Sequence, residues 1–306
     1  MGVGELVLDI LSPLLSSISF LIPGETFPFF FTLEIFQRAL VAALIVTIVS
    51  GFLGSFLLVR NMALMGDGLA HVSFGGVAVG VVLGSASPLW FALVFSVIAS
   101  ILIYEMQERD VLTGDASIAI FLTGMLALGL VVLRIWGGGI TTDIEGYLFG
   151  NLLLIDESSL DLIVIIGVIS IVSLLALYRA LLAIALDPLA ARIQGIPVRA
   201  TGIWFSIVTA AVVVSMVQVV GTLLVTALLV TPAATAQLIG KSFKSCIIWT
   251  QVFGISSVML GLYYSAELGT GSGSMIALVA GIVFASVLVI SKIVANISSN
   301  SETLDQ

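Results

Sequence analysis

Long apolar runs are the feature that most restricts what this chain can fold into. Nine segments rich in Leu, Val, Ile and Ala approach or reach the about 20 residues that an α-helix needs to cross a bilayer. Lipid offers no partner for free backbone groups, so such runs predict helices. The short alternating strands of a membrane β-barrel are not seen in the sequence. The segments are 39–59, 62–83, 89–104, 116–135, 160–181, 201–219, 222–239, 246–264 and 273–291.

The composition also indicates that the chain is embedded in a lipid bilayer. Only 9% of the residues are charged and 60% are hydrophobic, with a mean hydropathy of +1.27, whereas soluble domains carry about 25% charged residues. We therefore predict an all-α integral membrane protein, a polytopic bundle of about nine (eight to ten) transmembrane helices embedded in the lipid bilayer. The net charge of −8 argues against nucleic acid as a partner, because nucleic acid requires a basic face. Cys246 is the single cysteine, which rules out an intrachain disulfide framework.

The two ends of the chain differ from its middle. Residues 1–35 form an N-terminal extension ahead of a transmembrane domain at 36–292, and 293–306 form a short polar tail. Within the extension, the stretch 6–22 is apolar but short and contains Asp9. It lacks the basic start and the small-residue cleavage site of a signal peptide. It is either an extra span or an interfacial helix on the membrane surface, and we favour the surface helix.

The distribution of Lys and Arg predicts the orientation. Basic residues concentrate in cytoplasmic loops. A cytoplasmic C-terminus leaves only Arg38 and Arg134 outside, and the reverse orientation inverts that ratio. We therefore expect a multi-pass cell-membrane protein with its C-terminus in the cytoplasm. The residues then placed inside are Arg60, Arg109, Arg179, Arg192, Arg199, Lys241, Lys244 and Lys292.

The longest cytoplasmic loop of this topology, 182–200, contains signals for a short helix. Asp187 is a suitable N-cap for a helix that Pro188 begins, and Gly195 and Pro197 end it. The spacing describes an ordinary connecting helix as well as a docking surface for a cytoplasmic partner.

One acid and one imidazole stand a helical turn apart in the second segment. His71 is the only histidine of the chain, and Asp67 precedes it by four residues, so both project from one helical face. Ionisable residues inside a membrane usually face a cavity or mark an ion path. Carboxylate oxygen and imidazole nitrogen suit zinc, manganese or iron. The alternative is a structural Asp–His hydrogen bond near the inner interface, with Asp67 capping the helix.

Hydroxyl and amide side chains in the sixth and seventh segments are tentative pore-lining residues. Pro232 removes a backbone donor and is expected to kink its helix, and freed carbonyls and hydroxyls then line a hydrophilic path. Threonines that bond back to their own helix are an equally good explanation. The set is Gln218, Thr222, Thr226, Thr231, Pro232 and Thr235.

Several of these runs together resemble the permeases of zinc/manganese/iron ABC transporters. The hallmark stretch is 54–71, ending in Met65-Gly66-Asp67-Gly68-Leu69-Ala70-His71. Gly68 stands where alanine is usual and Ala70 where serine is usual. The runs at 143–151, 187–197 and 219–236 follow in the expected order. The resemblance covers about residues 36–290.

This resemblance implies a type II-like importer permease for a divalent ion, zinc, manganese or iron. Such permeases pair, here as a homodimer, associate with a cytoplasmic ABC ATPase dimer and receive the ion from an extracytoplasmic metal-binding protein. It implies that Asp67 and His71 contact the transported metal, and that ATP is hydrolysed only on the partner subunit, with no permanently bound cofactor and no enzymatic activity in this chain. The chain indeed lacks a Gly-x-x-x-x-Gly-Lys-Ser/Thr loop. The residues implied in coupling to the ATPase are Asp187, Pro188, Arg192, Gly195 and Pro197.

Two other kinds of transporter remain open on the sequence. An ABC permease for a metal chelate, such as a siderophore or cobalamin, needs no Asp–His pair in its path. A secondary transporter driven by an ion gradient works without an ATPase partner. Neither class explains the hallmark stretch around Asp67 and His71.

Overall fold

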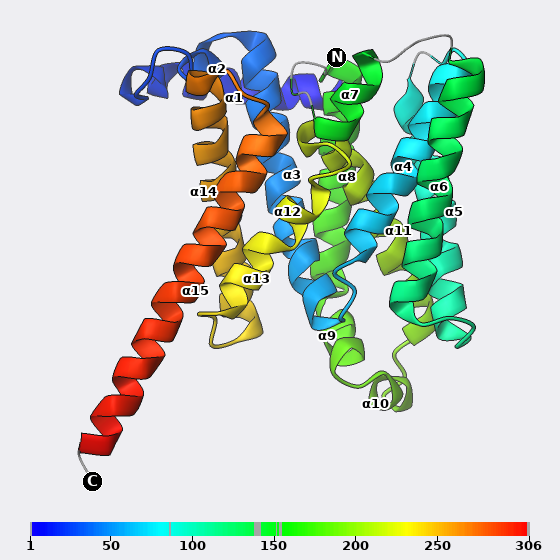
Figure 1. Ribbon diagram of the computed structural model, residues 1–306, viewed down its shortest axis with the longest axis vertical. Helices are drawn as coiled ribbons and strands as arrows, with labels where there is room; N and C mark the ends of the chain where they lie inside the picture. The colour runs from blue at the N-terminus through cyan, green and yellow to red at the C-terminus, as the bar shows by residue number, and fades with distance from the viewer. Residues whose placement is uncertain (1, 86, 138–141, 151, 153–154, 305–306) are drawn as a thin grey trace.

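The chain folds into a bundle of long helices that run nearly parallel and antiparallel to one another (Figure 1). The computed structural model describes all residues except 1, 86, 138–141, 151, 153–154 and 305–306, and it leaves undescribed the side chains of 142–145, 295 and 297–304. Its long helices are α3 (Glu34–Val59), α4 (Met65–Val82), α5 (Pro88–Glu108), α6 (Gly114–Trp136), α8 (Glu157–Ala176), α11 (Val198–Val220), α14 (Phe243–Leu268) and α15 (Ser272–Leu304).

Short helices connect or flank the long ones. They are α1 (Val3–Ile18), η1 (Ser19–Leu21), α2 (Phe29–Thr32), α7 (Thr142–Phe149), α9 (Tyr178–Leu186), α10 (Pro188–Ile193), α12 (Val225–Leu229) and α13 (Thr231–Gln237). The described residues contain no strand. The prediction of an all-α polytopic bundle is therefore confirmed.

The set of helices long enough to span a membrane differs from the predicted set in one member. In the described part of the chain nine helices are long and apolar enough to cross a bilayer, and they include residues 3–21 but not the predicted segment 222–239. That segment is split into α12 and α13, with the break at Val230. Pro232 lies in the first turn of α13, where its missing N–H costs nothing, whereas inside one continuous helix it would remove a hydrogen bond.

Close helix contacts surround α4. A Cβ atom added at Gly76 would lie 2.7 Å from the Cα atom of Ala92 in α5, and one added at Gly75 would lie 2.7 Å from the carbonyl oxygen of Met125 in α6. Small residues let helices approach closely in lipid. The glycines of α4 therefore serve packing, and α4, α5 and α6 form a tight group beside the central helix α11 (Figure 1).

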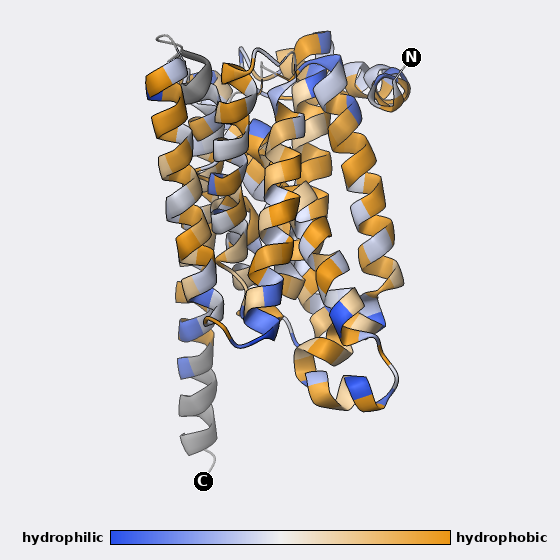
Figure 2. Ribbon diagram, turned by 90° about the vertical axis from the view of Figure 1, so that its right-hand side faces the viewer, coloured by the Kyte–Doolittle hydropathy of each residue, from blue (hydrophilic) through white to orange (hydrophobic). Residues whose placement is uncertain are grey.

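The two ends of the bundle carry different elements. The helix α10 and the C-terminus lie at one end, and α1, α2 and α7 lie at the other (Figure 1). The helix α1 runs across its end of the bundle and is seen end-on at the upper edge of Figure 2. The helix α15 continues to Leu304, so most of the polar tail at 293–306 extends this last helix.

Candidate metal pathway and coupling helix

A tight turn between α3 and α4 precedes Asp67 and His71, which lie in the first two turns of α4. The helix α3 ends at Val59, and Asn61 adopts a left-handed conformation with φ of +55°, which Asn tolerates better than most residues. The amide of Met62 then donates to the carbonyl of Leu57 at 2.8 Å. The chain reverses there, and Asp67 enters the first turn of α4, where the helix dipole favours a negative charge.

The ring of His71 is oriented by its own helix. Nδ1 lies 2.9 Å from the backbone carbonyl oxygen of Asp67. A carbonyl only accepts, so we assign the proton to Nδ1, which leaves the lone pair of Nε2 for another partner. Metal-binding histidines commonly donate their second nitrogen to a carbonyl or carboxylate in this way. The buried ring, 7% exposed, is therefore held in the tautomer that a metal ion requires.

The carboxylate of Asp67 lies between His71 and the broken segment. Its Oδ1 is 3.7 Å from Nδ1 of His71 and 3.4 Å from the hydroxyl oxygen of Thr226 in α12. The side chain of Asp67 remains 29% exposed, so one of its faces is open to an ion. The structure thus brings together three of the residues singled out from the sequence, one from α12 and two from α4.

Glycines hold α12 against this pair. A side chain on Gly54 of α3 would collide with the carbonyl oxygen of Leu229, and one on Gly66 would collide with the side chain of the same Leu229. On the other side of α4, Gly68 gives room to Ile118 of α6. The position of Thr226 beside Asp67 therefore depends on glycine at positions 54 and 66.

Thr226→Val tests whether this hydroxyl matters. The substitution keeps the volume of the side chain and removes its contact with Asp67. We expect metal uptake to fall about fivefold. This corresponds to about 1 kcal/mol, the free energy of one long hydrogen bond to a charged group. Thr235→Val is the control, because Thr235 donates to Thr231 of its own helix at 2.7 Å. Equal uptake by both variants would contradict a role for Thr226 in the path.

The remaining pore-lining candidates lie elsewhere. Gln218 donates to the hydroxyl of Ser159 in α8 at 3.0 Å, and its Oε1 is buried with no hydrogen-bond partner in the described part of the chain. Thr222 donates its amide to the carbonyl of Tyr147 in α7 at 2.9 Å. Pro232, with Thr231 and Thr235, belongs to α13. The structure therefore does not bring these five residues to the Asp67–His71 pair.

No closed metal cage surrounds Asp67 and His71 in the part of the chain that the structure describes. Among the described residues, no group of three or more His, Cys, Asp or Glu side chains is arranged to hold a metal ion. An ion held by Asp67 and His71 would have two protein ligands, and water or other oxygen atoms would complete its shell. Such a weak site suits a conduit, where the ion has to leave as well as enter.

The predicted cytoplasmic helix is present as α10. Oδ1 of Asp187 accepts the amides of Leu189 and Ala190 at 2.9 and 3.0 Å, which is an N-cap. Pro188 is the first residue of the helix, and Gly195, with φ of +82°, lets the chain reverse before Pro197 and α11. The predicted start and end of this helix are confirmed.

An apolar patch lies on the exposed side of this element. The coupling patch, as we name it, consists of Leu186, Leu189 and Ile193, which are 76%, 69% and 81% exposed. Leu186 is the last residue of α9, and Leu189 and Ile193 stand four residues apart in α10, at the end of the bundle that carries α10 (Figure 1). Exposed apolar groups of this kind occur at interaction sites, so α10 is a candidate docking surface as well as a connection between α9 and α11.

Ion pairs link α10 and α11 to α5, which the sequence did not predict. Arg192 of α10 pairs with Glu108, and Arg199 of α11 donates to Glu105 with Nε and Nη2 at 3.0 and 2.6 Å. The two glutamates lie at the end of α5, after a long apolar run. In the sequence such charged residues indicate only that a helix ends there. Their partners are more than 80 residues away, so no local pattern could identify them.

Comparison with known proteins decides the family. The model of the family described as "ABC 3 transport family" matches residues 32–291. The chain belongs to the ABC 3 transport family. The manganese import system permease protein ScaB of Streptococcus gordonii is 32% identical over 81% of this chain and 88% of its own length. The manganese transport system membrane protein MntC of Listeria monocytogenes is 34% identical over the same shares of the two chains.

Solved structures agree with this membership. A chain of PsaBC from Streptococcus pneumoniae, in complex with a Fab, superposes on this ABC 3 chain with a TM-score of 0.73 and 32% identity, covering 83% of this chain and 90% of its own. A putative metal-chelate type ABC transporter, at 16% identity and a TM-score of 0.67, shares the fold. The resemblance to metal-ion ABC importer permeases is confirmed, and this multi-pass membrane protein is a transport component.

Proposed function

We propose that this metal ABC importer permease carries manganese, and that Asp67 and His71 form a transient site for the ion on its path. The observation that carries the proposal is the hydrogen bond from Nδ1 of His71 to the carbonyl of Asp67, which leaves the lone pair of Nε2 for a metal ion, while the partly exposed carboxylate of Asp67 lies 3.7 Å from Nδ1 of the same ring. Relatives named as manganese permeases, such as ScaB and MntC, support manganese over zinc and iron.

The chemistry of the step follows from charge and coordination. A divalent ion that enters the bundle loses part of its hydration shell. Attraction by the carboxylate of Asp67 and coordination by Nε2 of His71 offset part of that loss. Thr226 adds one hydroxyl beside the carboxylate. Because protein supplies few ligands, the ion keeps water and is not trapped, as transport requires.

The partners belong to the same proposal. A second copy of the chain completes the path, an ABC ATPase dimer binds the coupling patch on α10, and an extracytoplasmic metal-binding protein delivers the ion at the α7 end. ATP is hydrolysed on the ATPase subunits. The alternating helices place all eight predicted inner basic residues toward the α10 end, which supports a cytoplasmic C-terminus.

Uptake by the assembled transporter tests the cargo. The permease, its ATPase and its binding protein are reconstituted in vesicles and supplied with radioactive manganese, zinc or iron. We expect ATP-dependent uptake of manganese, faster than the uptake of zinc or iron. Uptake of zinc in preference to manganese would overturn the metal assignment. Uptake that an uncoupler abolishes while ATP is retained would overturn ATP-driven import altogether.

Ile193→Asp tests the coupling patch. Placing a charge in the core of an apolar contact desolvates it without a partner, so we expect the affinity of the permease for the ATPase to fall about tenfold to a hundredfold. The measurement is the amount of ATPase that copurifies with the permease in detergent. Leu83→Asp, at an exposed apolar position of the opposite end (67% exposed), is the matched control. Unchanged ATPase recovery with Ile193→Asp would show that α10 is a plain connection.

A further inference from the structure

The N-terminal helix α1 has two apolar faces, and only one of them is covered by the rest of the protein. One face rests on the bundle, where Gly4 and Leu8 are buried and Leu11 packs against the core. An adjoining face is also apolar but points away from the protein. Its residues recur every three or four positions, as one stripe of a helix does. They are Val3, Leu6, Ile10, Leu14 and Ile18, between 45% and 69% exposed.

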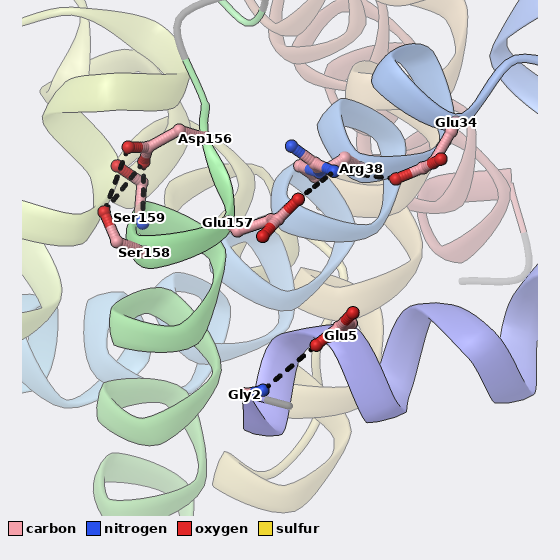
Figure 3. Close-up of polar contacts among 8 residues, drawn as sticks. All are labelled: Gly2, Glu5, Glu34, Arg38, Asp156, Glu157, Ser158 and Ser159. Carbon is pink, nitrogen blue, oxygen red and sulfur yellow. Dashed lines mark hydrogen bonds and ion pairs between the residues drawn. The ribbon is translucent and has the colours of Figure 1, made fainter.

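The third face of α1 is polar. Glu5, Asp9 and Ser12 line a recess of about 320 Å³ together with residues of α2, α3 and α8. Figure 3 shows Glu5 across from Arg38, which bonds to Glu34 at 2.8 Å and to Glu157 at 3.3 Å. The helix thus has one face toward protein, one toward a charged recess and one apolar face without a protein neighbour.

Two latches fix the helix in this orientation. At its start, the amide of Gly4 donates to Oδ1 of Asp161 in α8 at 2.6 Å. Beyond its end, the carboxylate of Glu267 in α14 accepts the amides of Glu25, Thr26 and Phe27 at 3.2, 2.9 and 2.8 Å. The first contact holds the start of α1 against α8, so α1 cannot roll its exposed apolar face toward the bundle without breaking it, and the second holds the chain that follows the helix.

The setting of α1 indicates what covers this face. The helix lies across the bundle axis at the α7 end (Figures 1 and 2), and it packs on α8. The middle of α8 presents Ile165, Val168 and Ile169, which are 44% to 57% exposed, to the lipid that surrounds a membrane bundle. The apolar face of α1 continues that lipid-facing surface.

We propose that α1 is an in-plane membrane anchor, whose face at Leu6, Ile10 and Leu14 inserts among the acyl chains of one leaflet. This leaflet is the outer one if the C-terminus is cytoplasmic, as proposed above. Residues 1–37 contain no Lys or Arg, so attraction to anionic headgroups plays no part and insertion is purely apolar. The anchor lies ahead of the matched family region, which begins at residue 32.

Spin labels on the full-length chain test the anchor. Cys246→Ala removes the single native cysteine, and Leu6→Cys, Ile10→Cys and Leu14→Cys then place a nitroxide at one position each, in vesicles of phosphatidylcholine and phosphatidylglycerol. Val168→Cys is the lipid-facing control and Asp9→Cys the water-facing control on the same helix. Collision with oxygen, which partitions into lipid, is compared with collision with a water-soluble nickel chelate.

We expect all three labels on the apolar face to collide with oxygen as the label at position 168 does, and to lie at one common depth. A steady change of depth from position 6 to 14, about 12 Å along a helix axis, would show a transmembrane span instead. Preferential collision with the nickel chelate would place the face in water. Protection from both reagents would show that a second copy covers it. Each of these three results would overturn the anchor.

Discussion

Asp67→Ala is expected to reduce metal uptake by the assembled transporter about 100-fold. The substitution removes the carboxylate that lies beside His71 and within hydrogen-bond reach of Thr226, and with it the charge that offsets the dehydration of the ion. Loss of a residue that merely orients a metal ligand typically costs 10- to 100-fold, so loss of the ligand itself belongs at or above the upper end of that range. Initial rates of manganese uptake in vesicles measure the effect.

The controls for this variant separate chemistry from folding. The buried ring of His71 keeps its hydrogen bond to the backbone carbonyl of residue 67, so the truncation leaves it paired and the variant should assemble normally with the ATPase. Asp67→Glu keeps the charge and should retain part of the uptake. Uptake by Asp67→Ala within threefold of the unmodified protein, with intact assembly, would mean that the ion takes another route or that the cargo is a chelate.

Gly54→Ala is expected to destabilise the fold strongly. The added methyl group would collide with the carbonyl oxygen of Leu229, an atom of the backbone that cannot rotate away, so α12 must move off α3. Overpacking of this kind costs about 1–3 kcal/mol and sometimes more. We expect a lower thermal unfolding midpoint in detergent. Because the same shift carries Thr226 away from Asp67, we expect uptake to fall as well.

A second helical glycine provides the matched control. Gly124 of α6 has no atom within 4 Å of the position that a Cβ would occupy, so Gly124→Ala adds the same methyl group without a collision. We expect an unchanged midpoint and unchanged uptake. If both variants behave alike, the contact between α3 and α12 is not what holds the broken segment in place.

The sequence predicted those features that local chemistry determines. Apolar run length predicted the helices, because lipid leaves the backbone no other partner. The dipeptide Asp187-Pro188 predicted the cap and the start of α10, and both are confirmed. The spacing of Asp67 and His71 predicted one helical face, and the structure places the two side chains together on α4.

Features that depend on contacts between distant segments could not be predicted from the sequence. The hydropathy of residues 222–239 is that of a span, yet the segment is broken, because Pro232 and the close approach to Gly54 fit a short helix better than a continuous one. Of six pore-lining candidates only Thr226 meets Asp67, across 159 positions of sequence. The transverse position of α1 depends likewise on carboxylates far along the chain, Asp161 and Glu267.

Anomalous X-ray scattering from manganese, recorded on crystals of the assembled transporter grown with Mn²⁺, tests the central claim most directly. The account predicts a scattering peak within coordination distance of both the carboxylate of Asp67 and Nε2 of His71, and no such peak in crystals of Asp67→Ala. A peak held by other side chains, with Nε2 of His71 enclosed in dry packing, would contradict it.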